Sequence, residues 1–189
     1  MGALDTLPRR KLSVNDFHRM GEAGILGEDD RIELIDGELI QMAPIGVVHA
    51  SKVNRLNRLL LSAVGNAANV SIQNPIALPP CDEPQPDIVS LRPRADDYLD
   101  ALPAAADVLL IVEVADTTLR YDRDIRIPLY ARHGIPEVWL VDLQSESVIV
   151  HRQPGPDRYH DVSTAGRDIV LSPLSIPGLR IDLAELWRR

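Results

Sequence analysis

A single acid interrupts one of the most apolar stretches of the chain. Glu113 lies inside the run 108–114, whose other residues are all aliphatic. A run of this kind predicts a strand that is covered on both faces of a sheet. Burying an ionised carboxylate costs several kcal/mol unless the group is paired, protonated or bound to a metal, so Glu113 needs a partner.

A second acid, Asp87, stands 26 positions earlier, after Pro86 and at the start of the apolar pair Ile88-Val89. This separation leaves room for a strand, a crossing and the neighbouring strand. If the two strands pair, both carboxylates meet at one point of the sheet. Oxygen ligands of this kind select hard ions such as Mg²⁺ or Mn²⁺, which polarise a phosphodiester and lower the pKa of a bound water.

The surrounding sequence predicts the elements that hold these acids. A capping box at Ser13 and Asp16 begins the first predicted helix, and Asp36-Gly37 predicts a hairpin turn. Apolar periodicity predicts helices over residues 14–22, 47–68, 122–133 and 182–187. It predicts strands over 31–40 (the hairpin), 70–78, 86–91, 108–115, 136–142, 147–152 and 158–162. This order indicates an α/β (α+β) fold, a mixed sheet flanked by helices.

Length, cysteine content, hydropathy and net charge limit the class of protein. We expect one domain over residues 1–189, with 1–12 as a flexible N-terminal arm. Cys81 is the only cysteine, which excludes an internal disulfide and a cysteine-based zinc site. No apolar run reaches the roughly 20 residues that span a bilayer, so we expect no membrane and a cytoplasmic location. The net charge of −8 argues against broad polyanion binding but permits a local basic surface.

Six motifs follow one another along nearly the whole chain. They are residues 31–38, His49, 85–89, 113–118, 120–124 and 130–142. In these motifs the chain resembles the Uma family of putative restriction endonucleases, which is placed in the PD-(D/E)XK nuclease superfamily. The resemblance implies a restriction-endonuclease-like fold and metal-dependent cleavage of DNA.

The resemblance also implies roles for single residues. By the family pattern, Asp87 and Glu113 bind the metal ion, Mg²⁺ or Mn²⁺, and Glu33 is an auxiliary acid. Arg126 occupies the position where the family usually has a lysine that orients the attacking water. Arginine keeps the positive charge, but its pKa above roughly 12 makes it an implausible general base. Only two of the 20 basic residues are lysine, so the chain strongly prefers arginine. Arg126 could follow from this preference at a site that needs only a positive charge, or it could mark the loss of catalysis.

Structural alternatives stand beside each of these roles. Glu113 could form a buried ion pair with Arg126, and Glu33 could be the solvent-facing member of a hairpin. His49, Lys52, Arg55 and Thr117 are candidate substrate contacts. Lys52, Arg55 and Arg58 recur every third residue on the long predicted helix, a spacing typical of a solvated face and also suited to a DNA backbone. His49 could equally be a surface residue, and Thr117 a turn cap.

Three functions are compatible with these residues. The first is a Mg²⁺-dependent endonuclease that acts on DNA. The second is a non-catalytic member of the same fold that binds nucleic acid or a protein, and the third is a metal-dependent hydrolase of another phosphoester. A homodimer is expected for the first function, because cutting both strands of a duplex requires two active sites or two events.

Overall fold

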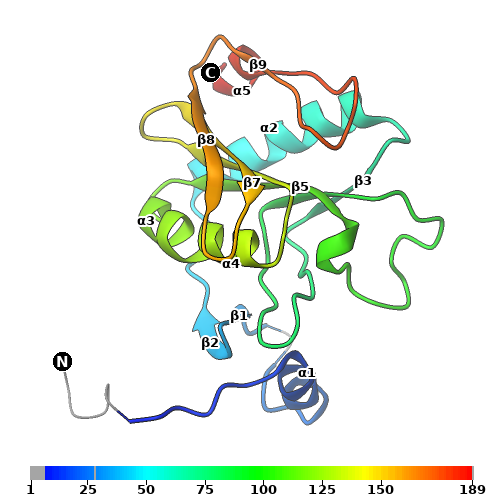
Figure 1. Cartoon of the computed structure of the whole chain (residues 1–189), viewed down its shortest axis with the longest axis vertical. Coiled ribbons are helices and arrows are strands. Elements are labelled where there is room, and N and C mark those ends of the chain that lie inside the picture. The colour runs from blue at the N-terminus through cyan, green and yellow to red at the C-terminus, as the bar shows by residue number, and fades with distance from the viewer. Residues whose placement is uncertain (1–6, 28, 189) are drawn as a thin grey trace. The chain divides into compact units, whose positions relative to one another are not determined.

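The computed structural model describes residues 7–27 and 29–188, and the chain divides into two compact units (Figure 1). The first unit consists of Met1–Ala43 and Ala77–Pro84, and the second of Pro44–Ile76 and Gln85–Arg189. The single domain expected from the sequence stays a prediction. Residues 1–6 of the expected N-terminal arm lie outside the described residues.

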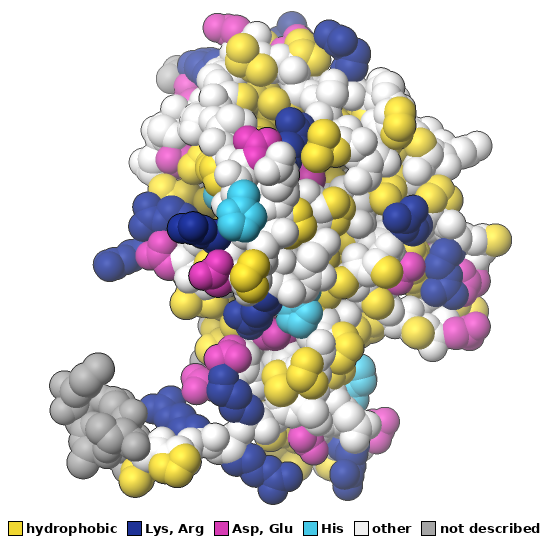
Figure 2. Space-filling view, in the orientation of Figure 1, with side chains coloured by type: hydrophobic (Ala, Val, Ile, Leu, Met, Phe, Trp, Pro, Cys, Tyr) yellow, Lys and Arg dark blue, Asp and Glu magenta, His cyan; other side chains and the backbone are white. Residues whose placement is uncertain are grey.

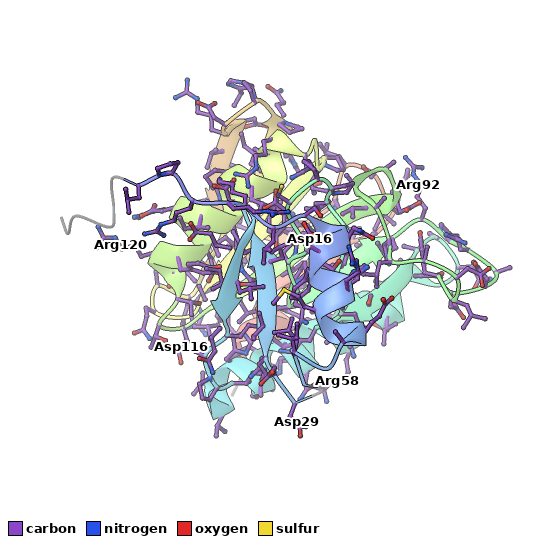
Figure 3. The ribbon with its side chains drawn as sticks, turned by 90° about the horizontal axis from the view of Figure 1, so that it is seen from below. Asp16, Asp29, Arg58, Arg92, Asp116 and Arg120 are labelled. Carbon is purple, nitrogen blue, oxygen red and sulfur yellow. The ribbon has the colours of Figure 1, made fainter. Side chains whose placement is uncertain are left out.

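The first unit begins with helix α1 (Val14–Glu22), as the capping box predicted. The Ser13 hydroxyl accepts the Asp16 backbone N–H at 3.1 Å, and the Asp16 carboxylate (labelled in Figure 3) accepts the Ser13 backbone N–H at 3.0 Å. These two bonds satisfy donors at the helix start that have no partner within the helix.

A two-residue hairpin completes the regular structure of this unit. Strands β1 (Ile32–Ile35) and β2 (Glu38–Gln41) pair antiparallel around Asp36 and Gly37. Both turn residues have positive φ, 50° and 72°, which this type of turn requires. A Cβ at position 37 would lie 2.5 Å from the Cβ of Lys11, so the close approach of the preceding chain also requires glycine.

The second unit contains a six-stranded mixed sheet in the order β3-β4-β5-β6-β7-β8. Its strands are β3 (Asn69–Ile72), β4 (Ile88–Leu91), β5 (Val108–Ala115), β6 (Glu137–Asp142), β7 (Ser147–Pro154) and β8 (Tyr159–Ala165). Among the described strands only β5 and β6 pair in parallel, so a crossover must join them. That crossover consists of α3 (Leu119–Tyr121), η3 (Asp122–Arg126) and α4 (Ile127–Arg132).

The remaining elements are α2 (Val47–Val64), η2 (Ala105–Asp107), β9 (Val170–Leu171), β10 (Ile181–Asp182) and α5 (Leu183–Trp187). The expected mixed sheet flanked by helices is thus confirmed, whereas η2, β9 and β10 were not predicted. None of the helices within the described residues is both long and apolar enough to span a membrane.

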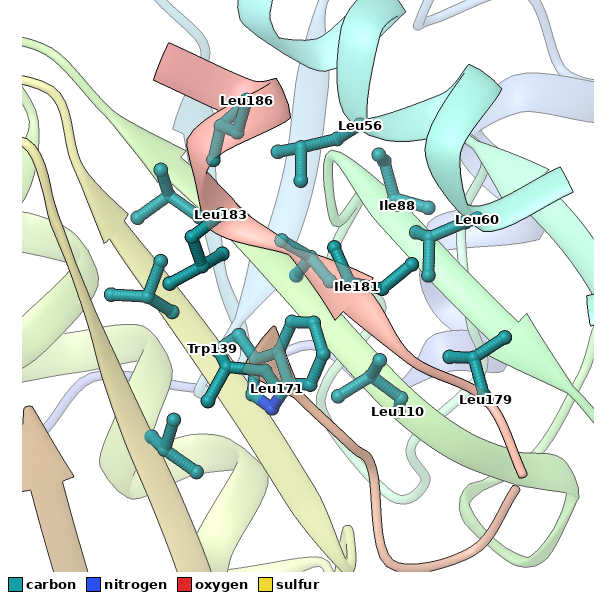
Figure 4. Close-up of a cluster of buried hydrophobic side chains, with 14 of the residues drawn as sticks. Leu56, Leu60, Ile88, Leu110, Trp139, Leu171, Leu179, Ile181, Leu183 and Leu186 are labelled. Carbon is teal, nitrogen blue, oxygen red and sulfur yellow. The ribbon is translucent and has the colours of Figure 1, made fainter. Parts of the chain in front are cut away.

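Alternation along β5 assigns its side chains to two faces. Leu110, Val112 and Val114 belong to an apolar cluster that also contains residues of α2 and α5, and Leu110 is labelled in Figure 4. Side chains that alternate with these lie on the opposite face, so Glu113 points toward the crossover helices. The sheet register therefore decides which helix can supply a partner to the buried acid.

Several predicted elements are shorter or less regular than expected. The helix predicted over 47–68 ends at Val64, and the strand predicted over 86–91 begins at Ile88. The strand predicted over 70–78 ends at Ile72, because Gln73 has a positive φ of 51° that an extended strand cannot continue. The helix predicted over 122–133 contains a wide π turn, η3, closed by a bond from the Ile127 N–H to the Asp122 carbonyl. Pro128 directly follows and has no N–H to donate, which disfavours regular α-helical bonding through this segment.

Candidate active site

The centre of the candidate site is formed by Asp87 and Glu113. The antiparallel register of β4 and β5 pairs Ile88 with Val112, and the next position along each strand places Asp87 opposite Glu113. The Asp87 N–H donates to Glu113 Oε2 at 3.3 Å, and the Val114 N–H donates to Asp87 Oδ2 at 2.9 Å. The structure therefore brings the two predicted acids together, although β4 begins at Ile88 and Asp87 directly precedes it.

The other oxygen of Glu113 is held by two side chains from the crossover. Glu113 is 1% exposed, and its Oε1 accepts from Arg126 Nη1 at 2.8 Å and from the Tyr130 hydroxyl at 2.5 Å. Burial raises the pKa of Glu113 to about 8, although the Arg126 guanidinium and the Tyr130 hydroxyl both favour the ionised form. A further positive charge beside this carboxyl would stabilise its ionised form.

Arg126 comes from the π turn and is itself 6% exposed. Besides Glu113 it contacts the Gln85 carbonyl, with 3.4 Å between Nη1 and O, and its Nε lies 3.8 Å from Asp122 Oδ1. Asp122 in turn accepts the Thr118 hydroxyl at 2.6 Å. The predicted ion pair between Arg126 and Glu113 is thus present, and Asp122 extends it. Neither Asp122 nor Tyr130 was predicted from the sequence to belong to this network.

The Asp87 carboxylate is contacted from two further elements. His49 Nε2, in the first turn of α2, lies 3.0 Å from Asp87 Oδ2, and Gln73 Nε2, just after β3, donates to Asp87 Oδ1 at 3.4 Å. The hydrogen bond to Asp87 raises the pKa of His49. His49, a candidate substrate contact by sequence, therefore lies against an acid of the site. Gln73 was missed, because only the pairing of β3 with β4 brings it opposite Asp87.

Two basic residues of α2, Lys52 and Arg55, contact the C-terminal helix. Lys52 Nζ donates to the Leu186 carbonyl at 2.8 Å and lies 5.4 Å from the centre of the Trp187 ring. Arg55 Nη1 donates to the same carbonyl at 3.4 Å. Burial lowers the pKa of Lys52. Arg58, labelled in Figure 3, is exposed.

Two other predicted site residues lie in different surroundings. Thr117 is exposed in the segment between β5 and α3. Glu33 belongs to the first unit, where it stands opposite Ile40 in the hairpin and is only 1% exposed. The hairpin acid is therefore a buried group rather than a solvent-facing one.

The carboxylates of Asp87 and Glu113 suit a hard cation that takes only part of its coordination shell from the protein. Within residues 7–27 and 29–188, no group of three or more His, Cys, Asp or Glu side chains is arranged to hold a metal ion. Mg²⁺ commonly uses one or two carboxylates together with water and substrate phosphates, which two acids can supply. On the face drawn in Figure 2, Lys and Arg side chains are interspersed with Asp and Glu, so this view shows no extended basic surface.

Comparison with known proteins places this site in context. The family described as "Uma2: Putative restriction endonuclease" matches residues 14–184. A crystal structure of a putative nuclease of the DUF820 family, from Anabaena variabilis, superposes with a TM-score of 0.73 and 17% sequence identity. The match covers 93% of this chain and 97% of that one, and it confirms the expected fold class. No curated protein matches the chain.

Proposed function

Since the chain belongs to the Uma2 family of putative restriction endonucleases, we propose that it is a metal-dependent endonuclease that hydrolyses DNA phosphodiester bonds. One observation carries the proposal. Glu113 in β5 stands opposite Asp87, the residue directly before β4, and each carboxylate accepts a main-chain N–H from the other segment. Hydrogen bonds from the main chain hold both carboxylates, which preorganises the site.

Asp87 and Glu113 are the residues that would hold Mg²⁺ or Mn²⁺. When bound, such an ion polarises the phosphodiester and lowers the pKa of a coordinated water. The burial of Glu113 supports this assignment, because desolvation disfavours its ionised form and raises its pKa, and a bound cation would offset that cost. Their oxygen-only donor set favours these hard ions over softer metals.

The other residues act through charge and orientation. In this proposal Arg126 supplies positive charge at the site and neutralises part of the Glu113 charge, while the Tyr130 hydroxyl fixes the orientation of that carboxylate. Arg126 does not accept a proton, because a guanidinium remains charged. Thr117 stays a proposed phosphate contact, Glu33 a proposed auxiliary acid, and a homodimer and a cytoplasmic location stay predictions.

A second function is favoured by one specific contact. Arg126 is already engaged with Glu113 at 2.8 Å, which makes the pair resemble a structural ion pair. On that basis the protein would be a non-catalytic module that binds nucleic acid or another protein. The two functions differ in whether a divalent ion supports chemistry at this position.

Plasmid nicking by the purified protein tests the proposal. We expect supercoiled DNA to be nicked with Mg²⁺ or Mn²⁺ and to stay intact with a chelator. An Asp87→Asn protein purified in parallel controls for contaminating nucleases and should be inactive, because the amide provides no charge for the ion. Equal nicking by the parent and Asp87→Asn, or no nicking by the parent with either ion, would contradict the proposal and favour the non-catalytic module.

A further inference from the structure

Gln73 has a backbone conformation that its residue type rarely adopts. Its φ is 51°, in the left-handed region where a Cβ is disfavoured and glycine is the usual residue. It directly follows β3, and the register of β3 and β4 places it opposite Asp87. Strained positions of this kind cluster at functional sites, so the reason for a glutamine here lies in what its side chain contacts.

Both the main chain and the side chain of Gln73 contact Asp87. The Gln73 backbone N–H donates to the Asp87 carbonyl at 3.1 Å, and its side-chain Nε2 donates to Asp87 Oδ1 at 3.4 Å. The other oxygen, Oδ2, receives the Val114 N–H at 2.9 Å and lies 3.0 Å from His49 Nε2. Gln73 is thus the side chain that orients the oxygen of Asp87 which Val114 and His49 do not contact.

The pairing of β4 with β5 continues this alignment from Asp87 to Glu113. Gln73 directly follows β3, Asp87 directly precedes β4 and Glu113 lies in β5, and continuing both registers by one position aligns the three residues. Neighbours of this kind lie close enough for their side chains to interact. A glycine at position 73 would relieve the backbone but would leave Asp87 Oδ1 without this donor.

We propose that Gln73 is a positioning residue, which orients the Asp87 carboxylate toward the divalent ion and keeps a strained backbone in order to do so. The inference rests on the proposed function, in which Asp87 binds that ion. Groups that orient a metal-binding side chain without contacting the metal typically change metal affinity by 10- to 100-fold. Gln73 does not touch the reacting atoms and acts only through Asp87.

A pair of glycine substitutions separates this role from a merely structural one. Gln153, in β7, is also a glutamine with positive φ (57°), and it is exposed and two strands away from β5. Both Gln73→Gly and Gln153→Gly relieve a left-handed backbone, so without metal both proteins should melt at or above the parental temperature. Only Gln73→Gly should bind Mn²⁺ more weakly, by about 10-fold, in a calorimetric titration.

Gln73→Asn provides a second variant that retains a side-chain amide. Asparagine tolerates the left-handed region, but its amide is one methylene shorter and loses the reach to Asp87. We expect the same weakening of Mn²⁺ binding and a normal melting temperature. Parental Mn²⁺ affinity in both Gln73 variants would overturn the inference, and so would a Gln73→Asn protein that melts far below the parent, because the role would then be structural.

The proposed function and this inference fail in different ways. A parent protein that binds no Mn²⁺ would overturn the proposed function itself. In that case the metal-free crystal structure of Gln73→Asn still tests whether Gln73 orients the Asp87 carboxylate. We expect the Asp87 carboxylate to rotate away from its parental orientation, and an unchanged Asp87 would overturn the positioning role.

Discussion

Asp87, directly before β4, stands opposite Glu113 in β5, and each carboxylate is hydrogen-bonded to the main chain of the other segment. Because one donor to each carboxylate is a backbone N–H, the pairing of the two segments helps to orient both acids, together with the side chains that contact them. A substitution that preserves the register should therefore change the charge at the site without moving its atoms far. This relationship makes the acids suitable for conservative amide substitutions.

Glu113→Gln should leave the metal-free protein stable and abolish its response to Mn²⁺. Burial disfavours the ionised form of Glu113 and raises its pKa, so a neutral amide of the same shape is tolerated. The parent should be stabilised by Mn²⁺ by about 2.7 kcal/mol at 100 times the dissociation constant, and Glu113→Gln by none. Thermal melts with and without Mn²⁺ measure both. Exposed Glu38→Gln is the control, and a parental Mn²⁺ response in Glu113→Gln would exclude Glu113 as a ligand.

Arg126→Ala should destabilise the fold, because it removes the cation paired with a fully buried acid. The expected loss is about 3 to 5 kcal/mol when Glu113 is ionised. Since burial raises the pKa of Glu113 to about 8, the loss should grow as the pH rises above that value, and Mn²⁺ should partly restore stability. Chemical denaturation at several pH values checks this expectation.

Arg126→Lys distinguishes charge from shape at the same position. If the site needs only positive charge, Arg126→Lys retains nicking, and Arg126→Ala loses about 10²- to 10³-fold in rate, as for a lost oxyanion donor. Restored cutting by Arg126→Lys in an inactive parent would instead show that arginine marks lost catalysis. Full activity and unchanged melting in Arg126→Ala would mean that neither role belongs to this residue.

Lys52→Ala should lower stability, whereas Arg58→Ala should not. The Lys52 ammonium donates to the Leu186 carbonyl and lies near the face of the Trp187 ring, contacts that are together worth about 1 to 3 kcal/mol. Arg58 lies on the same helix but is exposed. Urea denaturation of both variants compares them directly. Equal stability of Lys52→Ala and the parent would show that α5 does not depend on this contact.

His151 should make the protein lose stability in mild acid. It is 6% exposed, and among the described residues neither ring nitrogen has a hydrogen-bond partner. Burial lowers the pKa of His151 to about 4, below its value of about 6.5 in the unfolded chain. The unfolded state therefore binds the proton first, and stability falls as the pH drops from 6.5 to 4, by roughly 3 kcal/mol.

His151→Leu should remove this part of the pH dependence, since leucine is apolar and does not titrate. Denaturant midpoints measured between pH 4 and pH 7 give the two curves. We expect the parental curve to fall more steeply with acid than the curve of the variant. Two parallel curves would assign the acid sensitivity to other groups.

Local sequence determined those elements whose signals come from neighbouring residues. The capping box at Ser13 and Asp16 placed the start of α1, and Asp36-Gly37 placed the hairpin, because both depend on backbone geometry within a few residues. The aliphatic run around Glu113 identified a buried strand and an acid that needs a partner. Composition, motifs and order of elements were enough to predict the fold class.

Tertiary structure alone decided what surrounds that acid. The register of β3, β4 and β5 aligned Gln73, Asp87 and Glu113, and register depends on pairing between distant segments. The π turn before Pro128 then set which helical side chains reach Glu113, so Tyr130 became a donor to the site. The sequence could name the acids because burial of charge demands a partner, but it could not name all the partners, since they are brought together only by packing of the crossover on the sheet.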